Sequence, residues 1–113
     1  MHELAITQSI LSIALEQAEA VSARKITGVS LTIGELAGVV DECVEFYFEV
    51  LSKDTIAAGA SLSFDRPPTT LRCRKCDITF SPENQEWVCP TCREWQIEIV
   101  SGRECYVSSI EVE

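Results

Sequence analysis

The sequence predicts an α+β fold in which two helices pack on a small three-stranded mixed sheet and a cysteine-rich domain is inserted before the last strand. Two segments space their apolar residues as amphipathic helices do, and three segments alternate apolar and polar residues as strands do. Four of the six cysteines fall in two pairs between residues 73 and 92. The 113 residues are enough for one small domain and an appendage.

The first predicted helix covers residues 4–22. Leucine, isoleucine and alanine recur there at helical spacing, and Ile6, Ile10 and Ile13 widen the apolar stripe, so we expect much of this helix to be buried. A strand is predicted at residues 26–33, where valine, leucine and isoleucine alternate with serine and threonine.

The second predicted helix begins near Asp41, a residue type that favours the N-cap position. Its apolar face has i, i+3, i+4, i+7 spacing and consists of Val44, Tyr47, Phe48 and Leu51. Alternation at residues 61–65 predicts a second strand. A strand, a helix and a strand in this order form a crossover unit, so we expect the two strands to be parallel.

The predicted domain boundary lies at Pro67-Pro68, which cannot continue a central strand and serves as a hinge. Residues 106–112 alternate again and predict a closing strand that returns to the first sheet. The chain should therefore divide into a domain of residues 1–68 plus 103–113 and an inserted domain of residues 69–102.

The inserted domain contains two Cys-x-x-Cys pairs, and its four cysteines are Cys73, Cys76, Cys89 and Cys92. This spacing is typical of tetrahedral Zn²⁺ sites with four sulfur ligands, and it predicts a zinc-ribbon-like domain with a four-cysteine site. Residues 77–80 and 94–100 are candidates for its short strands. Four thiolates close the coordination sphere, so the metal should hold structure, with a regulatory role as an addition. Disulfides or a redox dithiol are the alternatives.

The N-terminus, Met1-His2-Glu3, is a candidate chelator. The terminal amine, the deprotonated amide of His2 and its imidazole close two rings around one metal, and nitrogen-rich square-planar coordination favours Ni²⁺ or Cu²⁺. Glu3 could fill a fourth position or support the others. A solvated early histidine is the competing interpretation, although His2 is the only histidine of the chain.

Composition excludes several functional classes. The net charge of −9, with no basic run longer than Arg24-Lys25, disfavours nucleic acid. No targeting segment and no apolar run long enough to span a membrane is visible, so we expect a cytoplasmic protein. No nucleophile–base pair, phosphate-binding loop or pair of catalytic carboxylates emerges, and the chain is predicted not to be an enzyme.

Four further side chains have two interpretations each. Cys43 and Cys105 lie outside the cysteine pairs, and we expect them to be small buried residues, with a secondary metal site as the alternative. Trp87 and Trp95 flank the second pair. We expect them to cover the inserted domain, with an exposed protein-binding surface as the alternative.

Taken together, three features resemble the HypA/HybF family of hydrogenase nickel-incorporation proteins: the start Met1-His2-Glu3-Leu4, the segment Ile33-Gly34-Glu35-Leu36, and the two cysteine pairs. The resemblance spans nearly the whole chain. It implies two helices on a small mixed sheet with a separate zinc domain, nickel held by Met1, His2 and Glu3, and zinc held by the four thiolates.

The resemblance also implies a function and partners. The protein would be a nickel metallochaperone that delivers Ni²⁺ to the NiFe hydrogenase large subunit, together with a HypB-like accessory GTPase. Some relatives serve urease, so a urease accessory protein is a further candidate partner, and the chain would be a monomer or a domain-swapped dimer. The alternative is a zinc-ribbon protein-interaction adaptor that transfers no metal.

Overall fold

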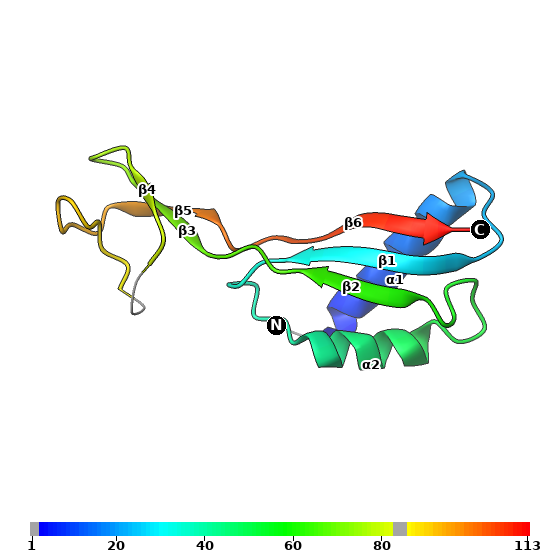
Figure 1. Cartoon of the computed structure of the whole chain (residues 1–113). Helices are drawn as coiled ribbons and strands as arrows, with labels where there is room; N and C mark the ends of the chain where they lie inside the picture. The colour runs from blue at the N-terminus through cyan, green and yellow to red at the C-terminus, as the bar shows by residue number, and fades with distance from the viewer. Residues whose placement is uncertain (1–2, 83–85) are drawn as a thin grey trace.

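Two helices and a three-stranded sheet form the larger part of the molecule (Figure 1). The computed structural model describes residues 3–82 and 86–113. Along the chain, α1 (Glu3–Ala20), β1 (Ile26–Ile33), α2 (Asp41–Leu51), β2 (Ser61–Asp65) and β6 (Cys105–Val112) build this part. The strand order is β2-β1-β6, so the last strand of the chain does return to the first sheet.

The sheet is mixed, as expected. β1 pairs with β2 in parallel, with Val29 opposite Leu62, and with β6 in antiparallel orientation, with Val29 opposite Ile110. The apolar residues of β1 contribute to the buried core, while Ser30 forms a hydroxyl–hydroxyl hydrogen bond of 3.0 Å with Ser63. The alternation in the sequence thus separates a core face from a polar face.

Helix α1 buries a narrower stripe than its sequence predicts. Thr7, Ile10, Leu11, Ala14 and Ala18 are buried, whereas Ile13 is 43% exposed. The expectation that Ile13 belongs to the core was wrong. Helix α1 packs against α2 and against strands β1 and β6, and these neighbours leave the Ile13 side of the helix open.

Helix α2 begins differently from the prediction. Its N-cap is Val40, which has an extended backbone and no side-chain cap, while Asp41 lies in the first turn. The carboxylate of Asp41 instead forms an ion pair of 3.1 Å with Arg66. The Val40 N–H donates to the carboxylate of Glu3 at 3.1 Å, so an acid from another helix satisfies a backbone donor at the start of α2.

The second sheet consists of β3 (Thr70–Cys73), β4 (Thr79–Phe80) and β5 (Ile97–Ser101), in the order β4-β3-β5. β4 and β5 fall at the two places where short strands are expected. The central strand β3 is absent from the prediction, because its four residues show only two cycles of alternation, too few to indicate a strand. All three strands lie between β2 and β6 in sequence, so the cysteine-bearing unit is an insertion.

The two sheets lie at opposite ends of an elongated molecule (Figure 1). The molecule measures 55 × 25 × 17 Å, and its radius of gyration is 17.7 Å. A compact chain of this length would have a radius of gyration of about 13 Å. Among the described residues, no helix has the length and apolar character needed to cross a membrane.

Candidate metal centre

The four predicted cysteines meet at one point in the inserted unit. The Sγ atoms of Cys73, Cys76, Cys89 and Cys92 all lie within 4.8 Å of one another. Cys73 and Cys89 are buried, while Cys76 and Cys92 are half-buried. The Sγ atoms of Cys73 and Cys92 are 3.7 Å apart, far beyond the roughly 2.05 Å of a disulfide, and all six cysteines are free thiols. The arrangement is a metal-binding group.

The same backbone turn presents each cysteine pair. In the first turn, the Asp77 N–H donates to the Cys73 carbonyl at 2.8 Å, and the Cys73 N–H donates to the Ile78 carbonyl at 2.9 Å. In the second turn, the equivalent hydrogen bonds join Arg93 to Cys89 and Cys89 to Glu94, both at 2.9 Å. The residue after each pair has a positive φ, 57° at Asp77 and 63° at Arg93.

The electrostatics of the group favour one thiolate before any metal binds. Hydrogen bonding from the Cys92 backbone, the largest cause, lowers the pKa of the Cys89 thiol to about 6. The side-chain hydrogen bond with Cys92 raises the pKa of the Cys76 thiol to about 12. A thiolate, not a thiol, is the metal ligand, so this lowered pKa favours the ligand form of Cys89.

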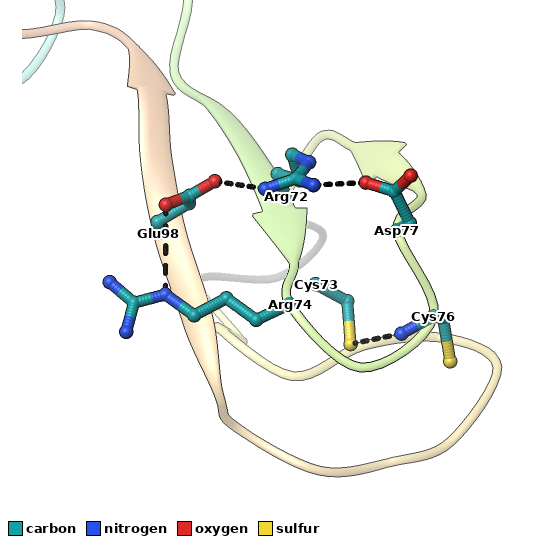
Figure 2. A network of polar contacts seen from close by, with 6 residues as sticks. All are labelled: Arg72, Cys73, Arg74, Cys76, Asp77 and Glu98. Carbon is teal, nitrogen blue, oxygen red and sulfur yellow. Dashed lines mark hydrogen bonds and ion pairs between the residues drawn. The ribbon is translucent and has the colours of Figure 1, made fainter.

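A network of charged side chains braces the first turn (Figure 2). The guanidinium of Arg72 on β3 bridges the carboxylates of Glu98 on β5 and Asp77 in the turn. Glu98 also pairs with Arg74, with 3.6 Å between Nε and Oε2. A separate ion pair of 3.3 Å joins Lys75 of the first pair to Glu94 beside the second. Although exposed ion pairs are individually weak, these connect both turns with the sheet.

The aromatic and remaining cysteine residues differ from expectation. Trp95 is 83% exposed, so the expectation that it covers the inserted unit was wrong. Trp87 is 38% exposed and lines a cavity of about 630 Å³ that also borders Leu36 and Pro68. Cys43 is half-buried and Cys105 is exposed at the edge strand β6, so the prediction that both are buried was wrong.

The loop between β1 and α2 joins the inserted unit to the larger sheet. Its Gly34 N–H donates to the Glu104 carbonyl and its Leu36 N–H to the Gly102 carbonyl, both at 2.7 Å. The carboxylate of Glu35 accepts from the Thr69 N–H at 2.7 Å. One loop therefore binds both chain segments that lead into and out of the inserted unit.

The same loop reaches the N-terminal end of α1. Val40, at the end of the loop, donates to the Glu3 carboxylate. Of the residues predicted to hold nickel, Glu3 is the first residue of α1, while Met1 and His2 lie outside the described residues. The sequence analysis missed the roles of Arg72, Glu98 and Glu35. Charged residues alternate with apolar ones around Arg72 and Glu98, and Glu35 lies in the segment that carries the resemblance, but neither signal identifies their partners.

This chain is similar to known proteins over nearly its whole length. Residues 1–112 match the family described as "Hydrogenase/urease nickel incorporation, metallochaperone, hypA". A hydrogenase maturation factor HypA of Dehalococcoides mccartyi is 46% identical over 113 residues, covering 100% of this chain and 95% of its own. The HypA of Geobacter sulfurreducens is 42% identical, with 100% of both chains covered.

Two solved structures have the same fold. The solution structure of the nickel metallochaperone HypA from Helicobacter pylori superposes with a TM-score of 0.71 at 25% identity, covering 99% of this chain and 97% of that one. A second HypA solution structure gives a TM-score of 0.78 at 26% identity, covering 100% and 97%. With the fold, the cysteine group and the full-length match in agreement, this chain belongs to the HypA family of hydrogenase and urease nickel-incorporation metallochaperones.

Proposed function

We propose that this chain captures Ni²⁺ through Met1, His2 and Glu3 and delivers it for maturation of the NiFe hydrogenase large subunit. The observation that carries the proposal is the family match over residues 1–112, combined with an N-terminal sequence that can chelate nickel. Nickel is the cargo. The members of this family are metallochaperones and maturation factors, so the chain is not an enzyme.

In this proposal the cysteine group holds Zn²⁺ permanently. Zinc–sulfur bonds of about 2.3 Å in a tetrahedron place the sulfur atoms about 3.8 Å apart. The 3.7 Å between the Cys73 and Cys92 Sγ atoms suits that edge length. Four thiolates are a donor set that zinc favours, and they leave no position open for water or cargo.

The N-terminal amine, amide and imidazole supply fewer ligands than the four thiolates, and a coordination position left for exchange suits capture and release. The terminal amine and the nitrogens of His2 supply square-planar ligands for nickel. The described contact of the Glu3 carboxylate with Val40 holds the start of α1 beside the start of α2. Glu3 thus supports the chelate by fixing its base and can add its backbone or side chain as a ligand.

The partners of this transfer are a HypB-like accessory GTPase and the hydrogenase large subunit, with urease maturation as a second destination. The family description includes both hydrogenase and urease. A reducing cytoplasm suits the six free thiols.

Replacing His2 with Ala tests the nickel assignment. The variant should bind nickel at least about tenfold more weakly, because it loses the imidazole ligand, and should keep its zinc. Calorimetric titration with NiSO₄ and metal analysis by mass spectrometry measure both quantities. The matched control is Gln8→Ala, an exposed change further along α1. Unchanged nickel affinity in the His2 variant would refute the assignment.

Three further measurements separate nickel delivery from an adaptor that transfers no metal. An N-terminal extension removes the free amine and should weaken nickel binding. Nickel affinity should also decrease as pH falls through the range of the imidazole pKa, about 6.5, because the proton displaces the metal. An adaptor would keep both partner binding and hydrogenase maturation in the His2→Ala variant, whereas a nickel carrier should keep the binding and lose the maturation.

A further inference from the structure

A groove of about 450 Å³ lies between α2 and β2, and none of the four clustered cysteines lines it. Figure 1 shows α2 running alongside β2, with the four-cysteine unit at the far end of the molecule. The groove lies within the roughly 300–1,000 Å³ range of pockets that hold ligands. Its lining includes Glu45, Phe48, Glu49, Ser52, Ser61 and Leu62.

One wall of the groove is the edge of a sheet. β2 is the outer strand of the order β2-β1-β6, and in the part of the chain that the structure describes it pairs with β1 alone. Because the N–H and C=O groups of a strand point alternately to either side, half of those in Ser61–Asp65 point outward, away from β1. An extended peptide can add to such an edge by main-chain hydrogen bonds.

The opposite wall carries uncompensated negative charge. Glu45 and Glu49 are exposed on α2, one helical turn apart, and within residues 3–82 and 86–113 neither forms an ion pair. Like charges at i, i+4 destabilise a helix slightly, so a cation between them would be favourable. Lys53, the nearest cation in sequence, comes after the end of the helix.

The floor of the groove is apolar. Phe48 is 2% exposed and belongs to the core, and Leu62 packs against the same core from β2. In a segment paired with β2, every second side chain points to the face that α2 covers. A long basic side chain at such a position can lie with its aliphatic stem along this floor and its charged end near the carboxylates of the α2 wall.

We propose that this groove docks an extended segment of a partner protein that is rich in lysine or arginine. The segment adds to β2 as a fourth strand, and its cations pair with Glu45 and Glu49. This assignment goes beyond nickel capture and uses none of the four clustered cysteines. The net charge of −9 adds a long-range attraction for such a segment.

The probe for this site is a capped hexapeptide of alternating lysine and valine. Titrated into the ¹⁵N-labelled full chain, it should shift backbone resonances at residues 45–52 and 59–65, and its affinity should decrease with added salt. The double variant Glu45→Gln with Glu49→Gln should bind about fivefold more weakly, from the loss of two exposed ion pairs. The matched control, Glu16→Gln with Glu19→Gln on α1, removes equal charge outside the groove and should bind as the wild type does.

Strand addition is tested separately from charge. In a peptide paired with β2, every second backbone N–H points toward β2. One probe peptide is N-methylated at the positions that point toward β2, and a second is N-methylated at the positions that point away. Only the second peptide should bind. Shifts elsewhere, equal loss in the two double variants, or equal binding of both methylated peptides would overturn the proposal. So would sedimentation showing that free chains dimerise with β2 amides protected, since the occupant would then be a second copy.

Discussion

At Gly34, where the loop after β1 meets the segment leading out of the inserted unit, there is no room for a side chain. A Cβ atom at this position would lie 2.2 Å from both the carbonyl carbon and the oxygen of Gly102, and 2.5 Å from the Glu104 carboxylate. The Gly34 N–H donates to the Glu104 carbonyl at 2.7 Å, so the loop cannot move away without losing a hydrogen bond. The absence of a side chain is therefore a condition for this close backbone approach.

Gly34→Ala should lower the free energy of unfolding by about 1–3 kcal/mol, because the added methyl group forces two backbones apart. Chemical denaturation followed by circular dichroism measures this change. Gly28→Ala is the matched control, since its Cβ would meet only the flexible Glu111 side chain, at 3.3 Å from a carboxylate oxygen, and it should change stability by less than about 0.5 kcal/mol. Equal losses of stability in the two variants would show that the close contact of Gly34 with Gly102 does not cause the loss.

Among the structural elements, the two cysteine-bearing turns repeat one another most closely. Each places a non-glycine residue at positive φ directly after its cysteine pair, Asp77 in one and Arg93 in the other. This backbone conformation costs an L-residue about 1–2 kcal/mol. In the first turn, the ion pair of Asp77 with Arg72 offsets part of this cost. In the second turn, Arg93 has no ion pair among the described residues.

Arg93→Gly should therefore stabilise the metal-loaded protein by about 0.5–1 kcal/mol, the relief of strain being partly offset by the greater flexibility of glycine in the unfolded chain. Asp77→Gly should gain less, because it removes the contact with Arg72. Thermal unfolding of both zinc-loaded variants tests the order. A loss of stability in Arg93→Gly would mean that its side chain contributes more than its backbone costs.

At the scale of the whole molecule, the core is distributed very unevenly. The larger sheet and both helices share one continuous core, which includes Val29, Leu31, Val44 and Phe48. In the described residues of 69–102, the buried apolar side chains are Leu71, Cys73 and Cys89. So small a core does not support an independent fold, and we expect a metal held by the four cysteines to contribute most of the stability of the inserted unit.

Removing the metal should consequently unfold one part of the molecule and spare the other. On addition of a strong zinc chelator, backbone resonances of residues 69–102 should collapse toward random-coil positions, while those of residues 1–68 and 103–113 remain dispersed. Cys73→Ser should reproduce this pattern and Cys105→Ser should not, because Cys105 lies outside the quartet. Loss of dispersion along the whole chain would refute the proposed domain division.

Much of the fold follows from local patterns in the sequence. Periodicity placed both helices and the three strands of the larger sheet, because burial of one face repeats every 3.6 residues in a helix and every two in a strand. Periodicity failed for β3, which is too short to show it clearly, and residue preference failed for the cap of α2. The donor of Val40 is satisfied by Glu3, thirty-seven residues away in sequence, which no local pattern records.

The candidate site, like the fold, could be predicted from the sequence only in part. The sequence alone identified the four cysteines that the structure brings together, because the two-residue gap in each pair limits where two thiols can point. Only the tertiary structure decided that Arg72 bridges Glu98 and Asp77 and that Trp95 faces solvent. It also decided that Gly34 passes against Gly102 and that a charged groove borders β2. The physical reason is that these features depend on which distant segments become neighbours, and that is settled by packing and through-space contacts.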